Sequence, residues 1–151
     1  MTATVCVWIA SDDPRMSEVH ELRHEALFAP FGLPRDDRWD DEGADRRHVI
    51  AVRGGAVVGY ASLLIEPDRT GHVRQVSVRD ALRGSGVGRA LMAEVAAEAH
   101  RLGLTGVWLN ARVTAEGFYQ RLGYRTVSDT PFPSGRTGVP HVRMELPLHD
   151  A

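Results

Sequence analysis

The sequence predicts a mixed α/β fold, with a central sheet flanked by helices. Short segments rich in β-branched and aromatic residues recur along the chain, and segments with the spacing of amphipathic helices lie between them. The chain has 151 residues, of which 43% are hydrophobic and 25% charged. This length and balance suit one globular core, so we expect residues 1–151 to form a single domain.

The first two elements are expected to be a strand and a helix. Residues 4–10 (TVCVWIA) are short and rich in β-branched and aromatic side chains, which favours a strand. Residues 15–28 place Val19, Leu22 and Ala26 at helical spacing.

A loop and three strands are expected next. Residues 29–47 carry prolines, glycines and six acidic residues, which is typical of an irregular loop. Residues 48–66 predict two strands joined by a tight turn at Gly54-Gly55, where a positive φ costs glycine little. Residues 72–78 predict a further strand.

The C-terminal half is expected to alternate helices and strands. A glycine-rich turn precedes a helix at 87–102, and Gly103 follows it as a stop signal. The remaining elements, in chain order, are a strand at 106–113, a helix at 114–123, a strand at 124–129, a loop at 130–140 and a strand at 141–146. The expected order is β-α-β-β-β-α-β-α-β-β, a mixed sheet.

Composition narrows the classes of function. A formal net charge of -2 gives no basic bias, so we expect no nucleic-acid partner. No apolar run approaches the length of a membrane span, and we expect no membrane association. The single cysteine, Cys6, excludes an internal disulfide and fits a reducing cytoplasm, where we expect the protein to reside.

The stretch QVSVRDALRGSGVGRALM (75–92) carries the clearest chemical signal. Gly84, Gly86 and Gly88 let the backbone curl so that several amides point into one concavity. The amides from Ser85 to Arg89 also open the following helix, whose dipole adds positive potential. Such a turn suits a pyrophosphate, with Arg83 and Arg89 as charged partners.

Two familiar phosphate motifs do not fit this turn. A P-loop requires a lysine, and the chain contains none. The dinucleotide-binding fingerprint requires G-x-G-x-x-G on the first strand, whereas here G-x-G-x-G follows the fourth. A helix start that uses glycines only for a tight turn is the remaining alternative.

The segment V-S-V-R-D-A-L-R-G-S-G-V-G-R-A-L-M resembles motif A of the GNAT superfamily of N-acetyltransferases, with Arg83-Gly84-Ser85-Gly86-Val87-Gly88 as its core. The segment A-E-G-F-Y-Q-R-L-G-Y is similar to motif B, with Ala115, Tyr119, Gly123 and Tyr124 at the family spacing. The resemblance covers residues 45–146. LRHEALFAPFGLP and GVPHVRMEL also resemble the ElaA-like subgroup.

The resemblance implies acetyl-CoA as donor, a small-molecule or peptide primary amine as acceptor, and no metal. It also implies a mostly antiparallel sheet whose fourth and fifth strands splay apart to admit the pantetheine arm. Backbone groups of Val76, Ser77 and Val78 would then pair with the pantetheine amides. The pyrophosphate would lie on the turn from Gly84 to Arg89.

The resemblance further implies direct attack by the amine within a ternary complex. Tyr119 matches the family's general acid, and a phenol with pKa about 10 is protonated at neutral pH. The alternative is that Tyr119 is a packed aromatic beside Phe118.

The sequence departs from the family pattern at two points. Arg112 stands where motif B usually carries an asparagine, and Asn110, two residues earlier, is the candidate to replace it at the cofactor. The fourth strand lacks the glutamate that serves some relatives as general base. The candidates for this role are Glu66, His72, His141 or water.

HELRH, from His20 to His24, matches the H-E-x-x-H pattern of zinc peptidases. A third ligand is missing, since only Glu42 in a hydrophilic loop could be proposed. A zinc hydrolase that uses His20, Glu21 and His24 is therefore a distant alternative, and we expect the match to be accidental.

The loop after the first helix could border the acceptor site. Its acids (Asp36, Asp37, Asp40, Asp41, Glu42 and Asp45) could attract a cationic amine, or could form a solvated face with the interleaved arginines. Trp39, Phe28 and Phe31 could line an acceptor pocket or anchor the loop. A homodimer stays open, with the last strand and loop 130–140 as its interface. A CoA-binding sensor or assembly module without catalysis is the main alternative function.

Overall fold

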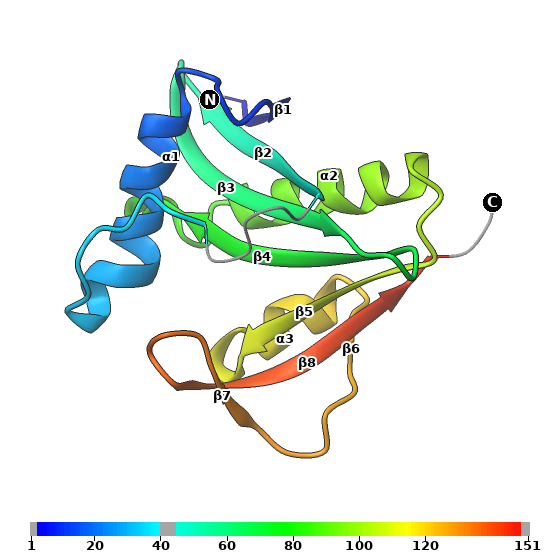
Figure 1. Cartoon of the computed structure of the whole chain (residues 1–151). Helices are drawn as coiled ribbons and strands as arrows, with labels where there is room; N and C mark the ends of the chain where they lie inside the picture. Colours follow the sequence, from blue (N-terminus) through cyan, green and yellow to red (C-terminus); the bar gives the residue numbers. More distant parts are fainter. Residues whose placement is uncertain (1–2, 40–44, 149–151) are drawn as a thin grey trace.

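A computed structural model describes residues 3–39 and 45–148, and its strands form one mixed sheet between helices (Figure 1). The strand order is β1-β2-β3-β4-β5-β8-β6, with β7 paired to β8. The strands are β1 (Val5–Ile9), β2 (Asp45–Arg53), β3 (Ala56–Ile65), β4 (Thr70–Val78), β5 (Gly106–Arg112), β6 (Arg125–Thr126), β7 (Phe132–Ser134) and β8 (Val139–Pro147).

The helices cover both faces of the sheet. They are α1 (Met16–Arg23), α2 (Val87–Arg101) and α3 (Glu116–Arg121), with a π-helical turn η1 (His24–Phe28) and 3-10 turns η2 (Ala29–Phe31), η3 (Asp80–Leu82) and η4 (Val113–Ala115). Helix α1 packs on one face through Met16, Val19 and Leu22. Helices α2 and α3 lie on the opposite face (Figure 1). No helix among the described residues is both long and apolar enough to cross a bilayer.

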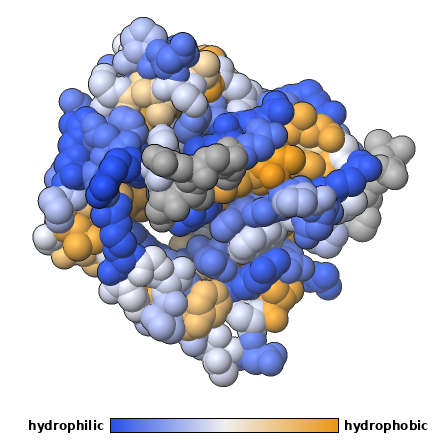
Figure 2. Space-filling model, in the orientation of Figure 1, coloured by the Kyte–Doolittle hydropathy of each residue, from blue (hydrophilic) through white to orange (hydrophobic). Residues whose placement is uncertain are grey.

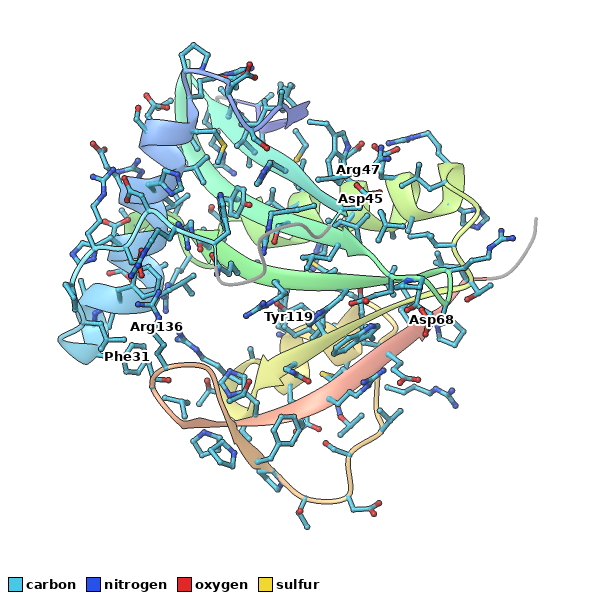
Figure 3. All side chains as sticks on the ribbon, in the orientation of Figure 1. Phe31, Asp45, Arg47, Asp68, Tyr119 and Arg136 are labelled. Carbon is cyan, nitrogen blue, oxygen red and sulfur yellow. The ribbon has the colours of Figure 1, made fainter. Side chains whose placement is uncertain are left out.

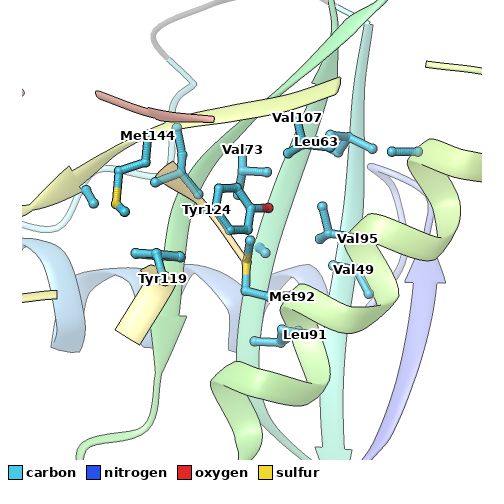
Figure 4. Packing of buried hydrophobic residues seen from close by; sticks show 14 of the residues in the cluster. Val49, Leu63, Val73, Leu91, Met92, Val95, Val107, Tyr119, Tyr124 and Met144 are labelled. Atoms are coloured by element: carbon cyan, nitrogen blue, oxygen red, sulfur yellow. The ribbon is translucent and has the colours of Figure 1, made fainter. Parts of the chain in front are cut away.

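The larger core lies between α2 and the sheet. Leu91, Met92 and Val95 recur on one side of α2 and are buried against strand residues such as Val49 and Leu63 (Figure 4). Burying each such side chain stabilises the fold by roughly 1.5–3 kcal/mol. This packing fixes where α2 begins, and therefore where the glycine-rich turn lies.

A close approach brings the start of α2 onto β3. A Cβ built on Gly59 would lie 2.7 Å from Val87 Cγ1 and 2.9 Å from Leu91 Cδ1, so only a glycine fits there without a shift. The glycine-rich turn is thereby held against the centre of the sheet.

Strands β4 and β5 separate, as the resemblance implied. Their parallel pairing covers Thr70 to His72 against Gly106 to Trp108, and it ends there. Beyond that point β4 pairs with β3 and β5 pairs with β8. The other described strand pairs are antiparallel. The mostly antiparallel, splayed sheet is confirmed.

A β-bulge bends β4 at the separation. Ser62 faces Arg74 and Tyr60 faces Ser77, so two residues of β4 lie opposite one residue of β3. Gln75, within this bulge, has a φ of 59°, which is uncommon for a residue other than glycine. The bulge turns the end of β4 away from β5.

The structure corrects several expected boundaries. The regular first helix ends at Arg23 and continues as the π-helical turn η1, whose extra residue per turn leaves little trace in the spacing of apolar side chains. The strand expected at 124–129 is limited to Arg125–Thr126. The expected loop 130–140 contains β7 and the start of β8, a hairpin whose Pro133 and Pro140 argue against strands in the sequence.

Candidate active site

The glycine-rich turn connects η3 to α2 and is held by its own backbone. Gly84 has a φ of 79° and Gly86 a φ of 94°, a conformation that favours glycine. A Cβ on either would meet no atom within 4 Å. The backbone conformation of the turn, and not lack of space, therefore calls for these two glycines.

The first turn of α2 offers free amides. The first helical bond runs from Ala90 N to Gly86 O, 3.0 Å, so the amides of Val87, Gly88 and Arg89 have no intrahelical partner. The Ser85 amide donates to the Leu82 carbonyl at 3.2 Å and is not among the free donors. Three N–H groups at a helix start form a site for an anion such as a phosphate.

Two arginines flank this turn. Both Arg83 and Arg89 are exposed, and Arg83 Nε lies 3.3 Å from Asp80 Oδ1. Because such an exposed ion pair contributes little, the Arg83 side chain can turn to a phosphate at low cost. The flanking charges fit the predicted pyrophosphate site.

At Gly88 the start of α2 comes close to α3. A Cβ at Gly88 would lie 3.2 Å from Phe118 Cζ and 3.9 Å from Val78 Cγ2. The start of α2, the end of β4 and the helix that carries Tyr119 therefore meet at one place.

The end of β4 presents backbone groups to the space between β4 and β5. Arg79 N donates to Val58 O on β3 at 2.9 Å. Because backbone groups alternate sides along a strand, those of Ser77 face β3, while those of Val76 and Val78 face the open side. The geometry therefore favours Val76 and Val78 as partners for a strand-like ligand.

Tyr119 is carried by α3 and belongs to the core on that side of the sheet, and Figure 3 shows it in the region where β4 and β5 diverge. Its side chain is buried against the rings of Phe118 and Tyr124, with centroids 5.0 Å and 5.7 Å away. Burial raises the pKa of Tyr119 to about 12, against a smaller lowering by the nearby charge of Arg112. The hydroxyl makes no hydrogen bond to a described residue, so this protonated phenol has a proton to donate.

Asn110 and Arg112 lie on the sheet face opposite to the main core. On β5, Leu109 and Ala111 are buried on the α2 side, so their neighbours Trp108, Asn110 and Arg112 point to the α1 side. The two candidates thus share a face, as the sequence indicated. Asn110 is exposed, and its contact with the cofactor stays a prediction.

Two base candidates lie at the closed end of the separation. His72 stacks on Trp108 at 3.6 Å, and its Nδ1 is 3.8 Å from Glu66 Oε1. Burial, followed by the charges of arginines, lowers the pKa of His72 to about 4, so His72 is neutral at neutral pH and pairs with Glu66 only weakly. His72 precedes Val76 by four strand residues, about 13 Å, which places both candidates away from the open end.

His141 lies at the open end. It faces Arg112 across the β5–β8 pair, and its Nδ1 is 2.5 Å from the Val139 carbonyl. A carbonyl only accepts, so Nδ1 carries a hydrogen, and in the neutral ring Nε2 then keeps the lone pair. His141 is therefore equipped to take a proton.

HELRH lies on α1 and at the start of η1, where Arg23 is its most buried member. Arg23 Nε donates to Gln75 Oε1 at 2.5 Å, which ties α1 to the β4 bulge. Arg23 Nη1 lies 2.8 Å from His20 Nδ1, so that nitrogen accepts from a guanidinium. Within residues 3–39 and 45–148 no three His, Cys, Asp or Glu side chains form a metal-binding group, and Glu42 lies outside the described residues.

The acids of the loop after η2 are engaged by arginines. Asp36 contacts Arg38 at 3.1 Å and Arg136 at 3.2 Å, and Arg35 binds Asp37 at 2.7 Å. This favours the interpretation of a charged face balanced by arginines. Asp40, Asp41 and Glu42 lie outside the described residues.

The aromatic residues of this region contact guanidinium groups. Trp39 lies under Arg23 and Arg46, Phe28 under Arg23 and Arg136, and Phe31 under Arg112. Sequence reasoning considered the aromatic residues and missed the arginines over them, because these contacts join segments far apart in the chain.

Comparison with known proteins agrees with this geometry. Residues 16–124 match the model of the acetyltransferase (GNAT) family. The chain is 26% identical over 136 residues to the uncharacterized N-acetyltransferase YjcF of Bacillus subtilis, covering 90% of this chain and 95% of that protein. It is 32% identical over 128 residues to ElaA of Escherichia coli, covering 82% of each.

Solved structures share the fold. The crystal structure of Escherichia coli ElaA superposes with a TM-score of 0.76 at 24% identity, covering 96% of this chain and 99% of that one. An aminoglycoside 6'-N-acetyltransferase complexed with coenzyme A gives a TM-score of 0.76 at 16% identity, covering 97% and 99%.

Proposed function

The chain belongs to the GNAT acetyltransferase family, and we propose that residues 1–151 form one N-acetyltransferase domain that uses acetyl-CoA and acts on a primary amine. The observation that carries this proposal is the juxtaposition of the separated strands β4 and β5 with the free amides of α2. An extended thioester arm fits between the strands, and its pyrophosphate fits the helix start.

In this proposal the cofactor is held mostly by backbone groups. Val76 and Val78 pair with the pantetheine amides, and Val87, Gly88 and Arg89 bind the pyrophosphate with Arg83 alongside. A coenzyme A complex of a protein with the same fold supports the placement. No metal takes part in the proposed reaction.

The proposed reaction is direct attack within a ternary complex. The amine nitrogen forms a bond to the thioester carbon, and the carbonyl π electrons move to oxygen. Return of those electrons breaks the C–S bond and releases the thiolate of CoA, while nitrogen loses a proton. Tyr119 donates a hydrogen bond to the sulfur as its charge develops, and a pKa of about 12 keeps the phenol protonated for this role.

The proton from nitrogen goes to His141 or to water. His141 lies at the open end of β5 and β8, with Nε2 available. Glu66 and His72 are not proposed for this role, because β4 and β5 are still paired where they lie.

A specific observation favours the alternative of a CoA-binding sensor. Arg112 replaces the expected asparagine, and β4 presents no glutamate toward the separated strands. Such a module would keep the glycine-rich turn and would bind acetyl-CoA without transferring its acetyl group.

Amine-dependent release of CoA tests the proposal. Purified protein is incubated with acetyl-CoA and a panel of amines, free thiol is followed spectroscopically, and product masses are measured. We expect thiol release that depends on the amine and equals the acetylated product. Binding of acetyl-CoA without amine-dependent release would instead support the sensor.

We also propose a cytoplasmic location, on the grounds of Cys6. It is the single cysteine of the chain, and burial raises the pKa of its thiol, which keeps it in the protonated, less reactive form.

A further inference from the structure

Guanidinium groups lie over aromatic rings along the α1 side of the sheet. Arg112 lies 5.0 Å from the Phe31 ring, Arg136 4.6 Å from the Phe28 ring and Arg143 3.9 Å from the Trp108 ring. We call these three arginines, together with Arg23, the arginine face.

Arg136 of the arginine face lies on a loop that borders a hollow in the surface. Figure 3 shows Arg136 close to Phe31, where the β7–β8 loop approaches the segment that follows α1. In the space-filling view the surface is hollowed between these two segments, and most residues around the hollow are hydrophilic (Figure 2). In Figure 1 these two segments lie at the end of the sheet where β4 and β5 diverge, the end from which an acceptor would reach the thioester.

Stacking on a ring leaves a guanidinium ready for a ligand. The ring covers one flat side, while the N–H groups point outward in the plane of the guanidinium. A planar fork of this kind matches the two oxygens of a carboxylate or a phosphate. An arginine held in this way is preorganised for an oxyanion.

Arg112 differs from the other members of the face in its polar contacts, since Arg23 already donates to Gln75 and to His20. Arg136 contacts Asp36 at 3.2 Å and Arg143 contacts Glu145 at 3.1 Å. Arg112 makes no hydrogen bond or ion pair to a described residue. Burial lowers the pKa of Arg112, and the charge of Arg83 lowers it further. A bound anion would therefore offset both the burial of the guanidinium charge and its repulsion by Arg83.

The electrostatics of a neighbouring histidine agree. After burial, the groups that lower the pKa of His72 are Arg74, Arg143 and Arg46. Its contact with Glu66, at 3.8 Å, does not reverse this effect. Around His72 the arginines therefore outweigh the nearby carboxylate of Glu66.

Building on the proposed acetyl transfer, we propose that the acceptor is an amine that also carries an oxyanion, a carboxylate or a phosphate, and that Arg112 binds this group. Arg112 and Tyr119 interact electrostatically, so the anion would be bound near the phenol. The amine of the same molecule then extends toward the thioester. This acceptor class differs from the polyamine that the acids of the loop alone would favour.

Matched acceptor pairs test the inference. Initial rates of CoA release are compared for phosphoethanolamine against ethanolamine, β-alanine against propylamine, and glucosamine 6-phosphate against glucosamine, with spermidine as the polycation. We expect at least one anionic member to exceed its neutral partner at least tenfold in kcat/KM. The phosphate and carboxylate pairs distinguish the two oxyanions.

Variants locate the effect at Arg112. In Arg112→Gln the preference for the anionic acceptor should fall at least tenfold through KM, while the Kd for acetyl-CoA stays unchanged. Arg112→Lys should keep part of the preference. Arg125→Gln, which removes an exposed arginine of β6, is the matched control and should keep all of it.

Three outcomes would overturn this inference and leave the proposed function standing. They are equal rates within every pair, a preference for spermidine, and an Arg112→Gln variant that binds acetyl-CoA more weakly while its acceptor KM is unchanged. The last would assign Arg112 to the cofactor. Absence of amine-dependent release with every amine would instead contradict the proposed function itself.

Discussion

Replacement of Tyr119 by phenylalanine should separate catalysis from stability. The side chain is buried, and its hydroxyl makes no hydrogen bond to a described residue, so its removal breaks no hydrogen bond. The free energy of unfolding should change by less than about 1 kcal/mol. Loss of a positioned acid should lower kcat by about 10²–10⁴-fold, which is about 3–5 kcal/mol of transition-state stabilisation.

The neighbouring tyrosine supplies a matched control. The hydroxyl of Tyr124 is also buried without a partner, and its ring lies 5.7 Å from the ring of Tyr119. Tyr124→Phe therefore makes the same chemical change in the same core and should leave kcat within about twofold of the wild type.

The assay combines urea unfolding, acetyl-CoA titration and steady-state thiol release for both variants. We expect both to bind acetyl-CoA as the wild type does, with only Tyr119→Phe losing turnover. Equal kcat values for Tyr119→Phe and the wild type would refute the role of the phenol.

Three further predictions concern the turn, the core and pH. Gly86→Val places a side chain at a φ of 94°, so it should cost about 1–2 kcal/mol of stability and weaken the binding of acetyl-CoA measured by calorimetry. Gly135→Val, at a φ of 72°, should carry similar strain and bind acetyl-CoA as the wild type does. Gly59→Ala brings a Cβ within 2.7 Å of Val87, so urea unfolding should show a loss of about 1–3 kcal/mol; an unchanged midpoint would contradict the close approach. Burial lowers the pKa of His48 and of His72 to about 4, against about 6.5 when unfolded. The unfolded chain then binds more protons below pH 6.5, so stability should fall from pH 6.5 toward 4 by up to about 1.4 kcal/mol per pH unit for each histidine. Urea unfolding of His48→Asn should show a shallower fall. A fall identical to that of the wild type would count against protonation of His48 as a cause.

The elements with local signals were predictable from the sequence. Helix α2 follows from apolar spacing and from Gly103, and the turn before it follows from the glycine pattern that its φ values require. The hairpin of β7 and β8 was missed because Pro133 and Pro140 argue against strands. In the structure these two prolines face each other within the hairpin.

The cofactor side of the site was more predictable than the acceptor side. The free amides of Val87 to Arg89 follow from the start of a helix, which residues adjacent in the chain determine. Arg23 meets Gln75 from 52 residues away, and Arg112 meets Phe31 from a different element. Neither contact leaves a local pattern, so the arginine face required the structure.

Calorimetric titration with acetyl-CoA tests the central claim most directly, with CoA and NAD titrated alongside. The free amides of α2 and the separation of β4 from β5 predict micromolar binding of acetyl-CoA and CoA, and none of NAD. Failure of both acetyl-CoA and CoA to bind would contradict the account, and the catalytic and sensor functions would fall together.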